Sequence, residues 1–342
     1  MNTPSTPPNL AQNGSILIIT LLVISILVVT VTETLRRMQV EQASTAVYTG
    51  FVQGQSRNRA ALACIKHLLA EDVRTQERAM DHLHEPWARF PDQSEVPLPP
   101  LGPLNATITA ENSKFPINAI VDDDGNWNTP YKDVFERLLR LPPFAVPEET
   151  LEQLLPALKD WMDPDNTPTG VHGAEKDAYT LQGSSVAPRN GPVQSLDELR
   201  HVRHMPARLF RATGHQPPLY DLLSVHTGSR ININTASPIL LAALVNPSVR
   251  PETAKAFAEN MVRYRNDPFH FEYLHEADWY RNRMAGFNDI QLPPKLISTT
   301  SSTFAITLTA RIGAVRASRY TLLKRDIQGD SVAFSTLYTE VQ

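Results

Sequence analysis

An uncharged apolar run near the N-terminus places the strongest constraint on the fold of this chain. The run extends from Ser15 to Thr32 and is followed at once by Glu33, Arg36 and Arg37. A helix over this run is roughly 27 Å long, which is enough to cross the hydrocarbon core of a bilayer. A cleaved secretory signal would have a shorter apolar core and a small-x-small site after it. The run therefore predicts a retained transmembrane helix.

The apolar pattern continues beyond this span at helical spacing, and no proline interrupts it between residues 9 and 85. One helix is therefore expected from the membrane to about His84, with Gly50 and Gly54 weakening it locally and Pro86 ending it. The stripe recurs every three or four residues at Leu35, Met38, Ala43, Ala46, Val47, Phe51, Ala61, Leu62, Ile65, Leu68, Leu69 and Val73.

The remainder of the 342-residue chain has the composition of a globular protein, with 20% charged and 42% hydrophobic residues. Its length suffices for two compact units. The formal net charge of −4 provides no basic field that would attract nucleic acid. A single cysteine, Cys64, excludes an intramolecular disulfide and is interpreted as a small buried side chain.

Alternating apolar and polar residues predict strands near both ends of the soluble region. Residues 104–110 form one candidate, and residues 114–121 form a second, which Pro116 confines to a sheet edge or a strand end. Residues 304–311 and 319–324, on either side of Gly313, predict a β-hairpin. The long block between these strands is predicted to be helical and inserted into a small α+β head.

Several helix signals lie within this block. Residues 129–165 carry two amphipathic patterns, and Ser195 with Glu198 matches a capping box. Thr235 or Ser237 is expected to cap a helix that begins near Pro238, and residues 251–265 form the next helix. These last two helices resemble a helix-hairpin-helix unit. Their connection lacks the glycine of DNA-binding hairpins, so we expect them to serve packing rather than nucleic-acid binding.

One loop gathers four carboxylates within a short stretch. Hard cations take six to eight oxygen ligands, which a folded loop can supply from carboxylates and carbonyls. The spacing is not that of an EF-hand, because positions six and twelve are Pro168 and Ala174. Two interpretations stay open, a calcium site and a solvated acidic loop with turn-forming residues. The candidate ligands are Asp163, Asp165, Glu175 and Asp177.

Signals for other chemistry are weak. The sequence contains no Gly-rich phosphate loop, no HExxH and no G-x-S-x-G motif. The acidic stretch 122–126 is interpreted as a plain turn, and His201 with His204 as exposed residues on one helix face. The sequence therefore predicts that the chain is not an enzyme.

The N-terminal region resembles that of type IV pilin-like proteins. Gly14 directly before the apolar run is similar to a prepilin peptidase site, and the resemblance implies cleavage between Gly14 and Ser15 with methylation of the new N-terminus. Most pilins carry a glutamate at the fifth mature position, which pairs with the N-terminal amine of a neighbouring subunit. Here that position is Ile19. Its missing acid is typical of the minor pseudopilin K family of type II secretion systems.

Three further strings are similar to this family: DHLHEPWA at 81–88, INxNTASP at 231–238, and the pattern DWxDxD…GAExxxY that begins at Asp160. The third is associated with bound calcium in the family. The resemblance implies an α+β fold in which a long N-terminal helix, first transmembrane and then amphipathic, packs on a small pilin-like antiparallel sheet. The expected parts are a leader (1–14), the helix (15–85), the first part of the head (86–121), an inserted α-helical domain (122–296, with the hairpin-like unit at 230–266) and C-terminal strands (297–342).

The resemblance also implies a function. It places the chain at the tip of the pseudopilus, above pseudopilins I and J, where it initiates assembly and supports export across the outer membrane. Other secretion components, the inner membrane, and a secreted substrate or the secretin are the further partners. The soluble domain is expected in the periplasm on the family's pattern, because Arg36 and Arg37 run against the positive-inside tendency. A minor type IV pilus subunit and a membrane-tethered DNA-uptake component remain as alternatives.

Overall fold

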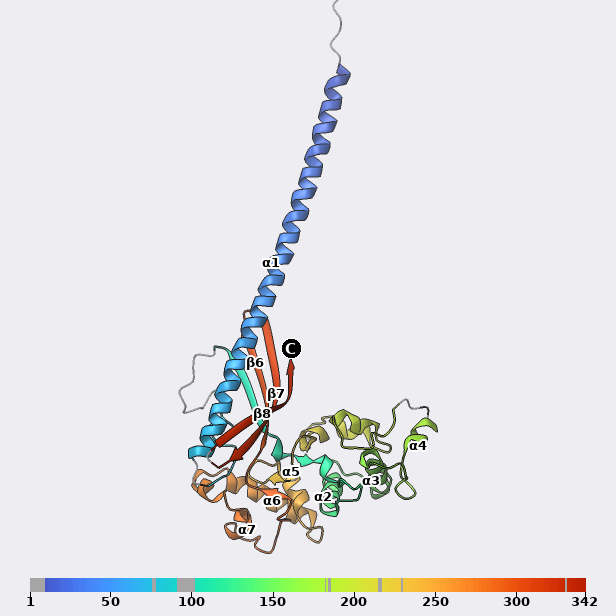
Figure 1. Ribbon diagram of the computed structural model, residues 1–342, viewed down its shortest axis with the longest axis vertical. Coiled ribbons are helices and arrows are strands. Elements are labelled where there is room, and N and C mark those ends of the chain that lie inside the picture. The colour runs from blue at the N-terminus through green and yellow to red at the C-terminus, as the bar shows by residue number, and fades with distance from the viewer. Residues whose placement is uncertain are drawn as a thin grey trace, which may run out of the picture.

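The computed structural model describes residues 10–75, 78–90, 102–181, 183, 186–214, 217–228, 230–329 and 331–342. Residues 1–9 of the expected leader lie outside this set. Figure 1 shows a long helix α1, a sheet packed beside its C-terminal half, and a helical region that lies beyond the sheet and extends to one side.

Helix α1 covers 66 residues from Leu10 to Thr75, and its N-terminal half projects away from the rest of the molecule (Figure 1). The hydroxyl groups of Ser25 and Thr30 each donate to a carbonyl oxygen four residues earlier, at 2.8 Å. These polar groups are therefore satisfied within the helix, as a bilayer requires. Among the described residues, α1 is the one helix long and apolar enough to span a membrane.

The expectation of a helix over residues 15–85 is wrong at its C-terminal end, because α1 ends at Thr75. Residues 80–85 form turns and irregular structure instead. The backbone N–H of Asp81 donates to the carbonyl oxygen of Thr299 at 2.8 Å, and its carboxylate binds Arg325. These tertiary contacts hold Asp81 in a position that a continuing helix could not offer.

Four antiparallel strands form the main sheet in the order β1-β6-β7-β8. Their bounds are Leu104–Ala110, Thr303–Ile312, Val315–Gln328 and Ser331–Val341. The predicted β-hairpin is confirmed as β6 and β7, with Gly313 at a positive φ of 58° in the turn. Strand β1 pairs with β6, which follows it only after the whole helical region. The helical region is therefore an insertion in the sequence between two neighbouring strands of the sheet.

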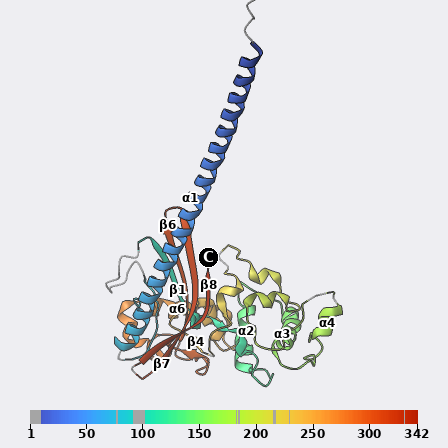
Figure 2. The ribbon, with the colours of Figure 1, turned by 45° about the horizontal axis from the view of Figure 1, so that its top comes forward.

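Helix α1 packs against one face of this sheet through its C-terminal half (Figure 2). Two glycines permit a close approach of the helix to β7. A Cβ atom on Gly54 would lie 2.5 Å from the Cβ of Ala317. One turn later, the side-chain amide of Asn58 donates to the carbonyl oxygen of Ala317 at 2.9 Å. The glycines that the sequence suggests as weak points in the helix thus serve contact with the sheet.

The helical region packs around a second and larger core. Two short parallel strand pairs lie within it, β2 (Phe115–Pro116) with β3 (Leu223–Ser224) and β4 (Ile231–Asn232) with β5 (Ile297–Ser298). Its α-helices are α2 (Thr129–Arg140), α3 (Glu148–Met162), α4 (Lys176–Leu181), α5 (Pro238–Leu244), α6 (Pro251–Arg265) and α7 (Trp279–Asn282). Its 3-10 helices are Glu111–Ser113, Ile117–Ala119, Leu196–His201, Ala207–Phe210, Leu219–Leu222 and Pro268–Tyr273.

Most local signals are correct in this region. The interpretation of His201 and His204 as residues on one helix face is wrong, because the 3-10 helix ends at His201 and His204 has a positive φ of 66°. Ser237 caps α5 by accepting from the N–H of Leu240, and Ser195 forms the predicted capping box, which here begins a 3-10 helix. The strand expected over residues 114–121 is reduced to the two residues of β2. Pro116 removes a ladder donor, and the turn that follows places Ile117 and Ile120 together in the core.

Gly54→Ala tests the close approach of α1 to the sheet. Helix propensity alone predicts a gain of about 1 kcal/mol, whereas overpacking against β7 costs about 1–3 kcal/mol. Because Ala317 belongs to a strand and cannot move aside freely, we expect net destabilisation, measured as a lower melting temperature. Restoring stability with the double variant Gly54→Ala/Ala317→Gly would locate the effect at this contact. Gly191→Ala, which enters open space, is the matched control and should change little.

Candidate cation site

The acidic loop is built around Asp160, which lies fully buried in the last turn of α3. Its carboxylate accepts the backbone N–H of Thr169 at 2.9 Å and that of Ala174 at 2.6 Å. A Cβ atom on Gly173 would lie 2.5 Å from the Asp160 carboxylate, so this position has room only for glycine. The loop therefore folds back over the end of α3.

Three buried carboxylates meet inside this loop. Asp160, Asp163 and Glu175 each offer an oxygen within 4.8 Å of the others. Two of the four predicted ligands, Asp163 and Glu175, thus come together. The structure does not bring the other two into the group. Asp165 is exposed and accepts the N–H of Thr167 at 2.6 Å, and Asp177 is exposed in the first turn of α4.

The third member of the group, Asp160, was absent from the predicted ligands. The sequence carries a signal for it, because Asp160 stands one helical turn before Asp163, and residues three apart on a helix share a face. Asp160 lies inside α3, whereas the four predicted ligands lie in or just after the loop that follows this helix. We call Asp160, Asp163 and Glu175 the loop cluster.

The loop cluster contains oxygens for which the protein supplies no hydrogen bond. Among the described residues, neither carboxylate oxygen of Glu175 has a hydrogen-bond partner, and neither does Oδ1 of Asp163. The other oxygen of Asp163 accepts from Nζ of Lys159 at 2.7 Å. Buried acceptors without partners are costly. A bound hard cation would satisfy them, so the donor set fits calcium.

Electrostatics in the loop cluster reinforce this fit. Burial, followed by the negative charges of Asp160, Asp163 and Asp165, raises the pKa of Glu175 to about 7. Burial also raises the pKa of Asp163, against the opposing effect of Lys159. The cluster therefore holds more negative charge than its surroundings compensate, and it gains by binding either a proton or a metal ion.

The second acidic stretch lies beside the loop cluster. A Cβ atom on Gly125 would lie 3.3 Å from the Cβ of Asp163. Within this stretch, Oδ1 of Asp122 accepts the N–H of Asp124 at 3.1 Å and that of Asn126 at 2.7 Å. The predicted turn is thus confirmed, with Asp122 engaged in holding it.

Helices α5 and α6 are arranged as the predicted hairpin. The connection between them turns at Asn246, whose carbonyl oxygen accepts the N–H of Val249 at 3.0 Å. Helix α2 packs beside α5, where the Arg137 guanidinium donates to the carbonyl oxygen of Ala243 at 2.8 Å. The apolar side of the pair contributes to the larger core.

A sequence model of the family described as "Type II secretion system (T2SS), protein K" matches residues 113–214, the segment that contains the loop cluster. Type II secretion system protein K of Klebsiella pneumoniae is 30% identical to the chain over 244 residues, which are 69% of this chain and 71% of that protein. The chain belongs to the protein K family. The protein of the same description from Pseudomonas aeruginosa is 28% identical over 258 residues, 74% of this chain and 72% of that protein.

The fold agrees with this membership of the protein K family. A chain from the crystal structure of the GspK-GspI-GspJ complex of enterotoxigenic Escherichia coli matches with a TM-score of 0.58 and 18% identity, covering 90% of this chain and 99% of that one. The expected α+β fold, with a long N-terminal helix on an antiparallel sheet and a helical region, is thereby confirmed. The chain is a minor pseudopilin of the type II secretion system, as the sequence predicts.

Asp160→Ala tests the role of this side chain in shaping the loop. The backbone N–H groups of Thr169 and Ala174 would lose a charged acceptor, so we expect the free energy of unfolding to fall by about 3 kcal/mol in calcium-free buffer. Denaturant unfolding measures the change. Asp177→Ala, at an exposed carboxylate, should cost less than about 1 kcal/mol. Equal effects of the two substitutions would contradict the assigned role.

Proposed function

We propose that this chain is the tip subunit of the type II secretion pseudopilus, where it initiates assembly and supports protein export across the outer membrane. The observation that carries the proposal is the position of the helical region. It lies at the end of the molecule opposite the membrane-spanning half of α1 and extends sideways beyond the sheet (Figure 1). A further pilin-like subunit stacked above would collide with it.

Ile19 supports the same placement. Its side chain is 57% exposed on α1, at the position where pilins carry an assembly carboxylate. A subunit above this one would find no acid there for its N-terminal amine. The subunit below can still supply a carboxylate to this chain. Ile19 thus favours the addition of subunits below this chain and not above it.

The partners we propose are pseudopilins I and J. The Escherichia coli relative of similar fold was solved in a complex with GspI and GspJ. The exposed amphipathic part of α1 offers a surface for neighbouring helices, with Val47 and Tyr48 among its exposed side chains. Other secretion components, and a secreted substrate or the secretin, are contacts for the helical region.

The membrane topology we propose is a single pass through the bacterial inner membrane with the sheet and the helical region in the periplasm. The exposed apolar half of α1 supports a bilayer location. Cleavage by prepilin peptidase after Gly14, with methylation of Ser15, would remove only the first residues of α1, which begins at Leu10. We further infer that the chain acts by assembly and not by catalysis, because its family belongs to the secretion apparatus.

Labelling of isolated pseudopili tests the tip position. Antibodies against the helical region should mark one end of each fibre when the complete set of pseudopilins is expressed. Antibodies against the major pseudopilin should mark the whole length and serve as the control. Regular labelling by the first antibody along the fibre would rule out the proposed location.

We also propose that the loop cluster binds calcium through Asp160, Asp163 and Glu175. Among the predicted ligands, Asp165 and Asp177 lie outside the cluster and are not required in this proposal. The cation would coordinate the carboxylate oxygens of Asp163 and Glu175 that lack hydrogen-bond partners among the described residues, and it would hold the loop against α3. Because the ligands must be ionised, binding would release the proton that Glu175 holds near neutral pH.

Calcium should raise the melting temperature by about 5–10 °C at a hundredfold excess over the Kd, relative to a chelator. Affinity should be about tenfold weaker at pH 6 than at pH 8, since the pKa of Glu175 is about 7. In the calcium-free protein the pH dependence of stability has the opposite direction. Because the pKa of the Glu175 carboxyl is raised in the folded state, its contribution to the free energy of unfolding is lost as the pH rises through 7. Titration calorimetry and thermal melting measure these effects.

Glu175→Gln should abolish the calcium response while keeping the shape of the side chain. Asp177→Asn is the matched control and should leave the response intact. A calcium-insensitive melting temperature in the unsubstituted protein would refute the calcium proposal without touching the tip assignment.

A further inference from the structure

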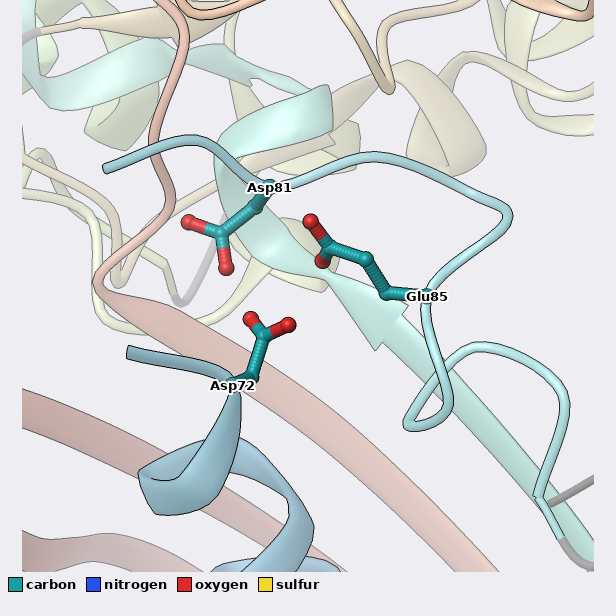
Figure 3. Close-up of side chains that lie close together, drawn as sticks. All are labelled: Asp72, Asp81 and Glu85. Atoms are coloured by element: carbon teal, nitrogen blue, oxygen red, sulfur yellow. The ribbon is translucent and has the colours of Figure 1, made fainter. Parts of the chain in front are cut away.

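A second group of buried carboxylates lies where α1, the sheet and the helical region meet. Figure 3 shows Asp72 near the end of α1, with Asp81 and Glu85 from the segment that follows, their carboxylates pointing toward one another. All three side chains are buried, and each offers an oxygen within 4.8 Å of the others. Arg325 of β7 reaches the same place. We call these four residues the joint cluster.

The guanidinium of Arg325 is bound by the other groups at this place. Its Nη2 lies 2.6 Å from each carboxylate oxygen of Asp81 and 2.8 Å from the carbonyl oxygen of Ser301. Its Nη1 lies 3.9 Å from Oδ2 of Asp72. Among the described residues, the carboxylates of Asp81 and Asp72 thus lie near this guanidinium, and each offers an oxygen within 4.8 Å of one on Glu85, so three carboxylates share this space. If all of them were ionised, the cluster would hold an excess of negative charge in a place closed to water.

Glu85 is the member whose surroundings suit a neutral carboxyl. The indole N–H of Trp87, itself fully buried, donates to its Oε2, a contact that favours the ionised form. The preference for the neutral form comes instead from burial and from the neighbouring carboxylates of Asp72 and Asp81. Its Oε1 lies 3.6 Å from Nε2 of His82. Burial, followed by electrostatic interactions with nearby His84 and Arg89, lowers the pKa of His82 to about 4, so this imidazole brings no charge at neutral pH.

The pKa of Glu85 follows from this geometry. Burial, followed by the charges of Asp72 and Asp81, raises the pKa of Glu85 to about 9. The titratable groups near Glu85 are therefore Asp72 from α1 and Asp81 and His82 from its own segment. Arg325 from β7 joins the cluster through its contact with Asp81. A carboxyl in this setting holds its proton well above the usual range.

The joint cluster also connects the three parts of the molecule. The side-chain amide of Asn232, on β4, donates to the carbonyl oxygen of Asp81 at 3.0 Å and to the hydroxyl of Ser301 at 2.9 Å. The rings of His82 and His84 each lie 4.7 Å from that of Phe271 in the helical region. Any repulsion inside the cluster therefore acts on the joint between the helical region and the head.

We infer that Glu85 carries a proton at neutral pH and that this proton keeps the joint between α1, β7 and the helical region closed. Ionisation at alkaline pH places a third negative charge beside Asp72 and Asp81 and loosens the joint. The sign follows from the raised pKa. The stabilisation is complete below the unfolded pKa of about 4.5 and is lost as the pH rises through about 9.

Trp87 offers a direct readout, because its indole N–H touches the carboxyl that titrates. The full-length chain in detergent micelles, labelled with ¹⁵N-tryptophan, should show an indole resonance that shifts with a midpoint near pH 9. Trp87→Phe assigns that resonance, and the remaining three of the four tryptophans are internal references. Glu85→Gln should abolish the shift. A midpoint below pH 6, or one that moves when a chelator is added, would overturn the inference, the latter by assigning the balancing charge to a metal ion.

Thermal melting tests the consequence for the joint. Between pH 7 and pH 9 the unsubstituted protein should lose about 3 °C for each pH unit more than Glu85→Gln does. The glutamine keeps an acceptor for Trp87 and cannot ionise. Glu152→Gln, at an exposed position on α3, should behave as the unsubstituted protein. Parallel loss of stability in all three proteins would exclude a role for the Glu85 proton.

Discussion

The structure depends on the buried ion pair between Arg325 and Asp81. Arg325 extends from β7, binds the carbonyl oxygen of Ser301, and lies with its guanidinium 5.0 Å from the ring of Phe304. The Asp81 carboxylate also accepts a hydrogen bond from the backbone N–H of Ser301 at 2.6 Å. A buried ion pair is a poor source of net stability, but its directional bonds admit few alternative arrangements. This pair fixes where α1 stops and where the helical region joins the sheet.

Two clusters of three carboxylates serve different purposes in this protein because their counter-charges differ. In the joint cluster, a guanidinium binds Asp81 through two short contacts, while burial beside Asp72 and Asp81 favours the neutral form of Glu85. In the loop cluster, Lys159 reaches one oxygen of Asp163, while both oxygens of Glu175 lack hydrogen-bond partners among the described residues. The first arrangement suits a proton and the second a larger hard cation. Similar composition thus leads to different chemistry.

The sequence predicted the local elements well where signals were short-range. The cap at Ser237, the capping box at Ser195 and the β-hairpin around Gly313 depend on neighbouring residues, and all three are present. Predictions that required knowledge of distant partners were less accurate. Gly54 was interpreted as a weak point in α1, since its partner Ala317 lies far along the chain. Asp160 was left out of the candidate site because only the folded loop brings Glu175 back to α3.

By itself the sequence determined that this protein has a helix long and apolar enough to span a membrane, continued by an amphipathic one, since hydrophobic length and periodicity are local properties. It also determined the likeness to the protein K family, through motifs such as INxNTASP and the missing acid at Ile19. Only the tertiary structure decided that the helix stops at Thr75 and that Asp160 joins the loop cluster. Both depend on contacts between residues distant in the chain, because a buried charge must find its partner wherever the fold provides one.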